Sequence, residues 1–339
     1  MHSVLTPPSF SDIQKAHSRI QKYINRTPVL TSTQVNEKVG GDIFFKCENF
    51  QKVGAFKFRG GSNAIFSLSD EEASKGVATH SSGNHAQAVA LAAKLRGIPA
   101  YVVMPENAPK VKVKAVKGYG AEVTFCESTL ESRETTLEKV VEKTGATFIH
   151  PYNDARIIAG QGTAAIELLE DYPDLDIIMA PVGGGGLLSG TALAAKSVKP
   201  EIKVIGAEPA NADDAYRSFK KGELIPVKNP DTIADGLRTS LGELPFTLIQ
   251  KYVDDIVTVS EGSIIEAMRY IWERMNMIIE SSCAVPVAAV FDGKIDVKGK
   301  KVGIIITGGN VDFDNLSIEG YQSQQLFRAV RFQHQISHR

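Results

Sequence analysis

The sequence predicts an α/β fold built from two open, mostly parallel sheets. Two observations lead to this prediction. Short apolar runs alternate with amphipathic segments along most of the 339 residues, which is typical of parallel strands joined by helices. Three of the apolar runs end directly in loops of glycine or other small residues, and open α/β sheets bind their ligands at such strand ends. The length indicates two domains.

Composition excludes several classes of protein. The chain has 38 Lys and Arg against 39 Asp and Glu, a net charge of −1, which argues against a nucleic-acid binder. No run reaches the roughly 18 apolar residues of a membrane span, and the N-terminus lacks the pattern of a signal peptide. The three cysteines are far apart and fit neither a disulfide framework nor a Cys-rich zinc site. We therefore expect a cytoplasmic protein.

The first elements are predicted from local signals. Ser11 and Gln14 have the spacing of a capping box, which predicts a helix from there to about Tyr23. Thr27-Pro28 ends it, and the apolar run at 42–47 predicts a buried strand.

Residues 76–149 are predicted to form a small domain of alternating strands and helices, inserted into a large domain made of 1–75 and 150–318. In the small domain we expect strands at 77–80, 100–104, 122–126 and 147–149. We expect helices at 109–117 and 130–143, and one that runs from the loop at 81–85 to Arg96. In the second half of the large domain we expect strands at 176–182, 203–207 and 301–307, and helices at 160–170, 187–196, 264–275 and 284–291. The last residues, 319–339, are rich in Gln, Arg and His and predict a disordered tail.

Four consecutive glycines, Gly183 to Gly186, stand between a predicted strand and a predicted helix. Backbone N–H groups at such a place surround a phosphate, and the helix dipole favours an anion. The run is neither a Walker A motif nor a dinucleotide fingerprint. A tight turn with close strand–helix packing explains the same glycines equally well.

Lys57 lies between Phe56 and Phe58, with Arg59 two positions on. Desolvation and a neighbouring cation both lower the pKa of an amine and favour Schiff-base chemistry. The alternative is an ordinary solvated lysine on a helix face.

Five motifs in order give the chain a strong resemblance to a known family. From about residue 9 to 314 it resembles the fold-type II pyridoxal-phosphate (PLP) enzymes, in their branch of serine racemases and threonine/serine dehydratases. These motifs are GAFKFRG (54–60), SSGNHAQA (81–88), PVGGGGLLSG (181–190), EPANADD (208–214) and TGGNVD (307–312). The resemblance implies two domains with the cofactor between them. Two further segments, HPYNDARIIAGQGT (150–163) and TIADGLRTSLG (232–242), are similar to eukaryotic serine racemases.

The resemblance implies a complete set of cofactor-binding residues. Lys57 matches the lysine that binds PLP covalently, and Asn84 matches the residue that hydrogen-bonds the 3′-oxygen of the cofactor. Thr307 stands where a serine usually faces the pyridine nitrogen, and a neutral hydroxyl there disfavours transamination. The phosphate is expected at the backbone of Gly183, Gly184, Gly185, Gly186 and Leu187.

The substrate carboxylate is expected at the loop that follows the strand 77–80. The residues implied are Ser81, Ser82, Asn84 and His85, with Arg133 as a weaker match. Ser82 is the informative position, because biosynthetic threonine dehydratases usually carry alanine there. In serine racemases a serine supplies the acid/base group on the cofactor face opposite the lysine. The alternative is a serine that only caps a helix or a turn. Tyr152 departs from the asparagine of mammalian racemases.

Two further sites follow from the resemblance. Glu208, the Ala212 carbonyl and Asp214 are expected to bind Mg²⁺ (or Ca²⁺ or Mn²⁺), a ligand set that suits a hard cation, although solvated acids explain the pattern too. ATP is expected as an activator at the interface of a homodimer. Its residues would be Ser32, Thr33, Lys52, Gln87, Tyr119 and Asn310, while Val53 and Asn276 depart from the mammalian pattern.

These observations predict a PLP enzyme that converts L-serine into D-serine and also eliminates water from serine, giving pyruvate and ammonia. The alternative is a dehydratase of L-threonine and L-serine, or of threo-3-hydroxyaspartate, without a significant racemase role. A non-catalytic PLP- or nucleotide-binding module is disfavoured because both acid/base residues are present.

Overall fold

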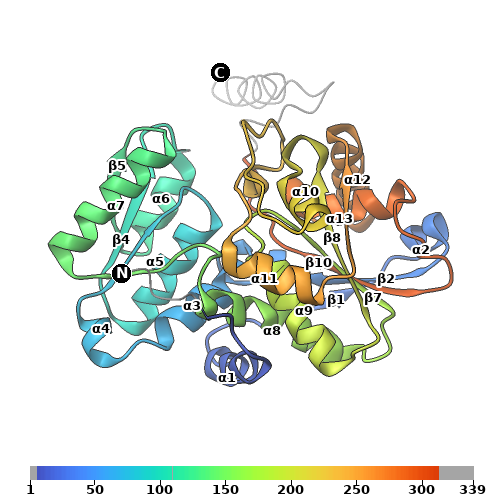
Figure 1. Ribbon diagram of the computed structural model, residues 1–339, viewed down its shortest axis with the longest axis horizontal. Coiled ribbons are helices and arrows are strands. Elements are labelled where there is room, and N and C mark those ends of the chain that lie inside the picture. Colours follow the sequence, from blue (N-terminus) through green and yellow to red (C-terminus); the bar gives the residue numbers. More distant parts are fainter. Residues whose placement is uncertain (1–5, 109, 313–339) are drawn as a thin grey trace, which may run out of the picture.

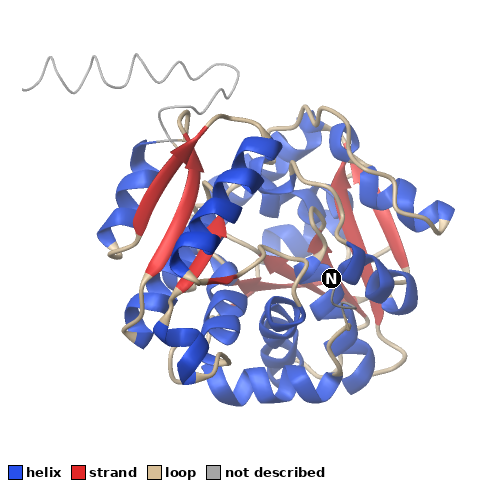
Figure 2. Cartoon of the chain, turned by 60° about the vertical axis from the view of Figure 1, so that its left-hand side comes forward, coloured by secondary structure: helices blue, strands red, loops and turns tan. Residues whose placement is uncertain are grey.

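The computed structural model describes residues 6–108 and 110–312. The predicted tail at 319–339 lies outside these residues. The chain forms two sheets side by side, with the smaller sheet and helices α5 to α7 on the left of Figure 1 and the larger sheet on the right. Figure 2 shows the strands as two groups, each flanked by helices. No helix in the described part of the chain combines the length and apolar composition that a membrane span needs.

The larger sheet has six strands in the order β1-β2-β10-β7-β8-β9. Neighbouring strands are parallel, except that β1 pairs with β2 in the antiparallel sense. The strands are β1 (Val29–Leu30), β2 (Asp42–Cys47), β7 (Ile177–Pro181), β8 (Lys203–Pro209), β9 (Asp255–Val259) and β10 (Lys301–Ile306).

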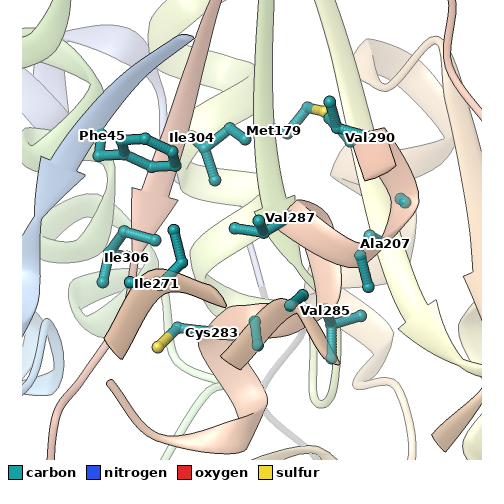
Figure 3. Close-up of a cluster of buried hydrophobic side chains, with 14 of the residues drawn as sticks. Phe45, Met179, Ala207, Ile271, Cys283, Val285, Val287, Val290, Ile304 and Ile306 are labelled. Carbon is teal, nitrogen blue, oxygen red and sulfur yellow. The ribbon is translucent and has the colours of Figure 1, made fainter. Parts of the chain in front are cut away.

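Helices cover both faces of this sheet, because its central strands are apolar on both sides. In β10, Ile304 and Ile306 enter one hydrophobic cluster and Ile305 enters the other. The first cluster surrounds α13 (Figure 3) and also includes residues of α2 and α12. The second includes residues of α8 to α11. The bounds are α2 (Thr33–Val39), α8 (Ala155–Asp171), α9 (Gly186–Val198), α10 (Asp214–Lys221), α11 (Glu243–Tyr252), α12 (Glu261–Met275) and α13 (Ser281–Phe291).

The smaller sheet has four parallel strands in the order β5-β4-β3-β6. One face packs on α3, α5 and α6, and the other packs on α7. Its four strands all lie within 76–149, while the domain boundaries themselves stay a prediction. The elements are β3 (Val77–His80), β4 (Ala100–Pro105), β5 (Glu122–Cys126), β6 (Thr147–Phe148), α3 (Lys57–Phe66), α4 (Asp70–Ser74), α5 (Asn84–Arg96), α6 (Lys110–Gly118) and α7 (Leu130–Thr144).

The predicted capping box is wrong by two residues. Helix α1 spans Phe10–Ile20, and its cap is Ser9, whose hydroxyl accepts from the Asp12 backbone N–H. The Asp12 carboxylate accepts in return from the Ser9 N–H at 2.9 Å, which completes the box. Ser9 itself has the extended backbone of a cap, with φ of −94° and ψ of 168°.

Helix α8 begins five residues before its predicted start at Gly160. Asp154 caps it by accepting from the Arg156 N–H. Gly160 and Gly162 lie inside the helix because its neighbours come very close: a Cβ at Gly160 would lie 2.6 Å from Gly60 Cα, and one at Gly162 would lie 2.7 Å from the Gly190 carbonyl oxygen. Glycine, which usually weakens a helix, is here required for packing of α8 on α3 and α9.

Candidate active site

The site lies where β3, β7 and β10 end. The segment before α3 runs beside the one that follows β10: the Phe56 N–H donates to the Thr307 carbonyl at 2.9 Å, and the Gly309 N–H donates to the Gly54 carbonyl at 3.0 Å. These bonds place the start of α3 next to the buried Thr307. The structure therefore brings together two predicted cofactor residues, Lys57 and Thr307, that are far apart in the sequence.

Lys57 is the first residue of α3 and is half-buried. Its Nζ donates to the Pro151 carbonyl oxygen at 2.9 Å. Burial lowers the pKa of the Lys57 ammonium to about 8, and the nearby Glu280 carboxylate limits the decrease. At neutral pH a fraction of this amine on the order of a tenth is unprotonated, as a nucleophile requires.

Asn84, the first residue of α5, is held from two sides. Its Nδ2 donates to both carboxylate oxygens of Glu280 at 3.1 Å, and its Oδ1 accepts from Asn310 Nδ2 at 2.8 Å. Burial, together with Asp235, raises the pKa of Glu280 to about 7. The sequence did not predict Glu280, which precedes α13 without capping it through its side chain. Asn310 was predicted only for the nucleotide site.

The four glycines form a close-fitting turn that leads into α9, whose first residue is Gly186. Gly185 has φ of 84°, which favours glycine. A Cβ at Gly184 would lie 2.3 Å from the Tyr152 ring, and one at Gly183 would lie 3.0 Å from Leu237 Cα. The first N–H groups of a helix have no acceptor within the helix. This turn therefore presents N–H donors and the positive end of the α9 dipole, the arrangement that binds an anion.

The loop between β3 and α5 contains the predicted substrate residues. Ser81 Oγ accepts from the Gly83 N–H at 3.2 Å, and Ser82 is half-buried beside it. His85 Nε2 lies 3.2 Å from the Ile149 carbonyl oxygen, so that nitrogen carries the proton. Burial lowers the pKa of His85 well below its ordinary value, and the imidazole is neutral. These residues lie at the start of α5, next to Asn84.

Two more histidines lie near this loop and were not predicted. His80 and His150 have ring centroids 6.4 Å apart, and burial lowers the pKa of each to about 4. Arg133, half-buried in the first turn of α7, contributes to the low pKa of His80. Tyr152 packs edge-on against His150 at 4.6 Å, and its hydroxyl lies 2.9 Å from Thr239 Oγ1. Arg133 is thus a cation near the neutral ring of His80, as Lys57 is near that of His150. The sequence signal that could have revealed this cluster is the run His150-Pro151-Tyr152, which directly follows a predicted strand.

Glu208 and Asp214 form a second buried group, which we call the acid pair. Glu208 accepts from the Ala215 and Tyr216 N–H groups at 3.2 and 2.8 Å, and Asp214 Oδ2 accepts from the Leu241 N–H at 2.8 Å. Asp214 Oδ1 is buried without a hydrogen-bond partner among the described residues. Burial raises the pKa of both carboxyls, that of Asp214 to about 6, and Asp214 raises that of Glu208 further.

The acid pair fits a hard cation. The buried Ala212 lies between its members in the sequence, and an unpartnered carboxylate oxygen is the ligand that such a cation takes. Within residues 6–108 and 110–312 there is no cluster of three or more His, Cys, Asp or Glu side chains suited to a metal. A metal at the acid pair would therefore depend on the carbonyl and on water for its remaining ligands.

The predicted nucleotide residues do not all gather within one chain. Ser32 caps α2 by accepting from the Val35 N–H, and α2 lies on the opposite side of the molecule from α6, which Tyr119 follows. Lys52 Nζ lies 5.8 Å from the Phe58 ring centroid. A site that used all six residues would need a second copy of the chain (Figure 1).

A family model described as "Pyridoxal-phosphate dependent enzyme" matches residues 20–308. The chain belongs to this family. It is 53% identical over 316 residues to a serine racemase of Dictyostelium discoideum, covering 91% of this chain and 97% of that protein. It is 51% identical over 309 residues to a beta-hydroxyaspartate dehydratase of Paracoccus denitrificans, covering 91% and 98%. The solved structure of a maize serine racemase superposes with a TM-score of 0.92 at 46% identity, covering 97% of this chain and 100% of that one.

Membership confirms the predicted fold class and the dependence on PLP. The chain is a PLP-dependent enzyme of the serine racemase and dehydratase group. The relatives carry two different activities at nearly equal identity, so similarity alone does not separate them.

Proposed function

We propose that this PLP enzyme interconverts L-serine and D-serine and also eliminates water from serine, with pyruvate and ammonia as the final products. The observation that carries the proposal is that the chain has both an amine of lowered pKa, Lys57, and a half-buried hydroxyl, Ser82, in the loop before α5. Racemisation needs a proton acceptor on one face of the substrate and a donor on the other, whereas elimination needs only one.

The residues of the site fit PLP. The glycine turn before α9 has no room for side chains, offers N–H donors and would hold the phosphate together with the Leu187 amide. Asn84 would contact the 3′-oxygen, Thr307 would face the pyridine nitrogen, and Lys57 would bind the cofactor covalently. When bound, the cofactor withdraws electrons from the substrate Cα and so makes its proton acidic.

The protein side chains then move protons at that carbon. Lys57 takes the α-proton of L-serine, and the Ser82 hydroxyl returns a proton from the other face to give D-serine. Ser81 and His85, at the start of α5, orient the substrate carboxylate. A buried neutral His85 acts as a hydrogen-bonding group and not as a cation at neutral pH.

A dehydratase of threo-3-hydroxyaspartate is the second candidate function. One observation favours it: Arg133 is half-buried beside the neutral His80, and an arginine there matches a second substrate carboxylate. The relative from Paracoccus denitrificans, named for this type of reaction, gives independent support. Elimination from L-threonine belongs to the same alternative.

Three further parts of the proposal concern partners. The acid pair, with the Ala212 carbonyl, would bind Mg²⁺, Ca²⁺ or Mn²⁺, in keeping with the unpartnered oxygen of Asp214. The chain would form a homodimer. ATP would bind between the two copies, which is consistent with the separation of α2, capped by Ser32, from α6, which precedes Tyr119.

The experiment that tests the function combines three substrates with one substitution. Purified enzyme is incubated with L-serine, L-threonine and threo-3-hydroxyaspartate, and both amino-acid enantiomers and keto acids are measured. We expect D-serine and pyruvate from L-serine. In Ser82→Ala, D-serine formation should fall about 10²–10⁴-fold, the contribution of a positioned acid/base group, while pyruvate formation from L-serine changes little.

Ser81→Ala is the matched control, because it removes a hydroxyl from the same loop without removing the proposed proton donor. It should slow racemisation and elimination in parallel. If Ser82→Ala still racemises L-serine at the rate of the unsubstituted enzyme, the two-base mechanism is wrong. If the enzyme turns over hydroxyaspartate and makes no D-serine, the dehydratase is the correct function.

A further inference from the structure

The largest buried group of charges in the described residues lies outside the site. Lys46, Glu48, Arg59 and Glu167, which we call the Arg59 cluster, are 0 to 2% exposed. They come from β2, the short 3-10 helix Glu48–Phe50, α3 and α8. Two positive and two negative charges balance within the cluster. Nothing in the proposed chemistry uses these side chains.

Every N–H of the Arg59 guanidinium has an acceptor. Nε and Nη2 donate to the two oxygens of Glu48 at 2.7 and 2.8 Å. Nη1 and Nη2 donate to the two oxygens of Glu167 at 2.8 and 2.7 Å, and Nη1 also donates to Thr163 Oγ1 at 3.2 Å. Lys46 Nζ donates to Glu167 at 2.6 Å. Five donors and five acceptors leave a single allowed orientation of the side chain.

Arg59 and Lys57 lie in the same first turn of α3. The acceptor of Lys57, the Pro151 carbonyl, belongs to the segment that leads into α8, and α8 also carries Glu167 and Thr163. The two helices touch through glycine: a Cβ at Gly160 would lie 2.6 Å from Gly60 Cα. The cluster therefore fixes the spacing of the two elements that carry Lys57 and its acceptor.

We propose that Arg59 is a positioning residue for Lys57: its five-bond attachment to Glu48, Glu167 and Thr163 sets the first turn of α3 against α8 and so holds the Lys57 amine in its desolvated place. The inference rests on the proposed role of Lys57 but not on the identity of the substrate. Arg59→Lys tests it, because lysine keeps the charge and has at most three donors, without the planar fork.

The main readout is the titration of Lys57 in the full-length apoenzyme. Competitive labelling with acetic anhydride across a pH series, read by mass at Lys57, gives its pKa without substrate or turnover. In the unsubstituted protein we expect a pKa of about 8 for Lys57. In Arg59→Lys the neutral fraction of Lys57 at pH 7 should fall at least about tenfold, because a loosened α3 admits water to the amine. Covalent attachment of added PLP, followed by absorbance, should slow in parallel.

Arg26→Lys is the matched control. Arg26 also binds two carboxylates of α8, Glu170 and Asp171, but it is half exposed, and these two acids lie in the last turn of that helix, at the end away from Pro151. The Arg26→Lys substitution should leave the pKa of Lys57 unchanged. If Arg59→Lys does not fold, Glu167→Gln carries the test with the same readout. A folded variant of the cluster in which Lys57 titrates as in the unsubstituted protein would overturn the proposal, whereas failure of serine turnover alone would bear only on the proposed function.

Discussion

The Arg59 cluster and the acid pair both place carboxylates in the interior, where desolvation of a negative charge is unfavourable. The two groups differ in whether the chain supplies a compensating positive charge. In the Arg59 cluster each carboxylate faces cations: although burial raises the pKa of Glu167, Arg59 and Lys46 hold it below its ordinary value. In the acid pair, burial and Asp214 raise the pKa of Glu208, and one oxygen of Asp214 has no hydrogen-bond partner in the described chain. The first group is compensated within the chain, whereas the second leaves a carboxylate oxygen without a partner among the described residues.

The difference separates a structural role from a binding role. Desolvating a charge is unfavourable unless a partner compensates for it. Where the chain itself supplies the partner, as Arg59 does, the group orders neighbouring elements. Where the chain leaves carboxylate oxygens unmatched, the missing charge must come from solution or the group must take up a proton.

The largest effect is expected when the balance of the Arg59 cluster is broken. Glu167→Gln leaves two buried cations facing one carboxylate, which should lower the free energy of unfolding by about 3–5 kcal/mol. Urea denaturation followed by circular dichroism measures it. Adding Mg²⁺ should not restore the lost stability, because the substitution leaves an excess of positive charge, which repels a cation. A loss below about 1 kcal/mol would mean that the interior there admits water.

Glu280 shares one feature with each group. Like the carboxylates of the Arg59 cluster it has a donor within the chain, Asn84, and like the acid pair it has a raised pKa, of about 7. The folded state then keeps a proton that the unfolded state, with an ordinary pKa near 4.5, releases. The stability from this group is complete below about pH 4.5 and is lost as the pH rises through 7, a change of about 3 kcal/mol.

The measurement compares unfolding of the apoenzyme and of Glu280→Gln between pH 5 and 8. The variant should gain stability relative to the unsubstituted chain as the pH rises. A difference between the two proteins that is constant with pH would show that Glu280 is ionised throughout this range.

The acid pair should respond to metal in a way that the Arg59 cluster does not. With Mg²⁺ at about 100 times its Kd, binding to the folded state adds about 2.7 kcal/mol. Chelator should lower the melting temperature and the activity, and Mg²⁺ should restore both. Asp214→Asn should abolish the response to Mg²⁺ and to chelator. If it keeps that response in full, the cation binds elsewhere.

The sequence predicted best what depends on neighbouring residues. The strand at 122–126 has the bounds predicted for it, and α5 ends at Arg96 as expected, since alternation and glycine stops are local signals. The glycine turn was found for the same reason. The Arg59 cluster was missed because its members carry no periodic pattern: Lys46 and Glu167 are 121 positions apart. Glu280 meets Asn84 across 196 positions, and only the fold brings them together.

The smallest effect is expected at Arg26, the exposed counterpart of Arg59. It binds Glu170 and Asp171 at 2.7 and 2.6 Å, as closely as Arg59 binds its acids. Its side chain is 50% exposed, however, against 0% for Arg59. Water and salt screen the exposed pairs, so Arg26→Ala should lower the free energy of unfolding by no more than about 1 kcal/mol, and less at high salt. A loss equal to that of Glu167→Gln would show that distance, and not burial, determines the energy of these ion pairs, and the contrast between balanced and unbalanced interior charges would lose its basis.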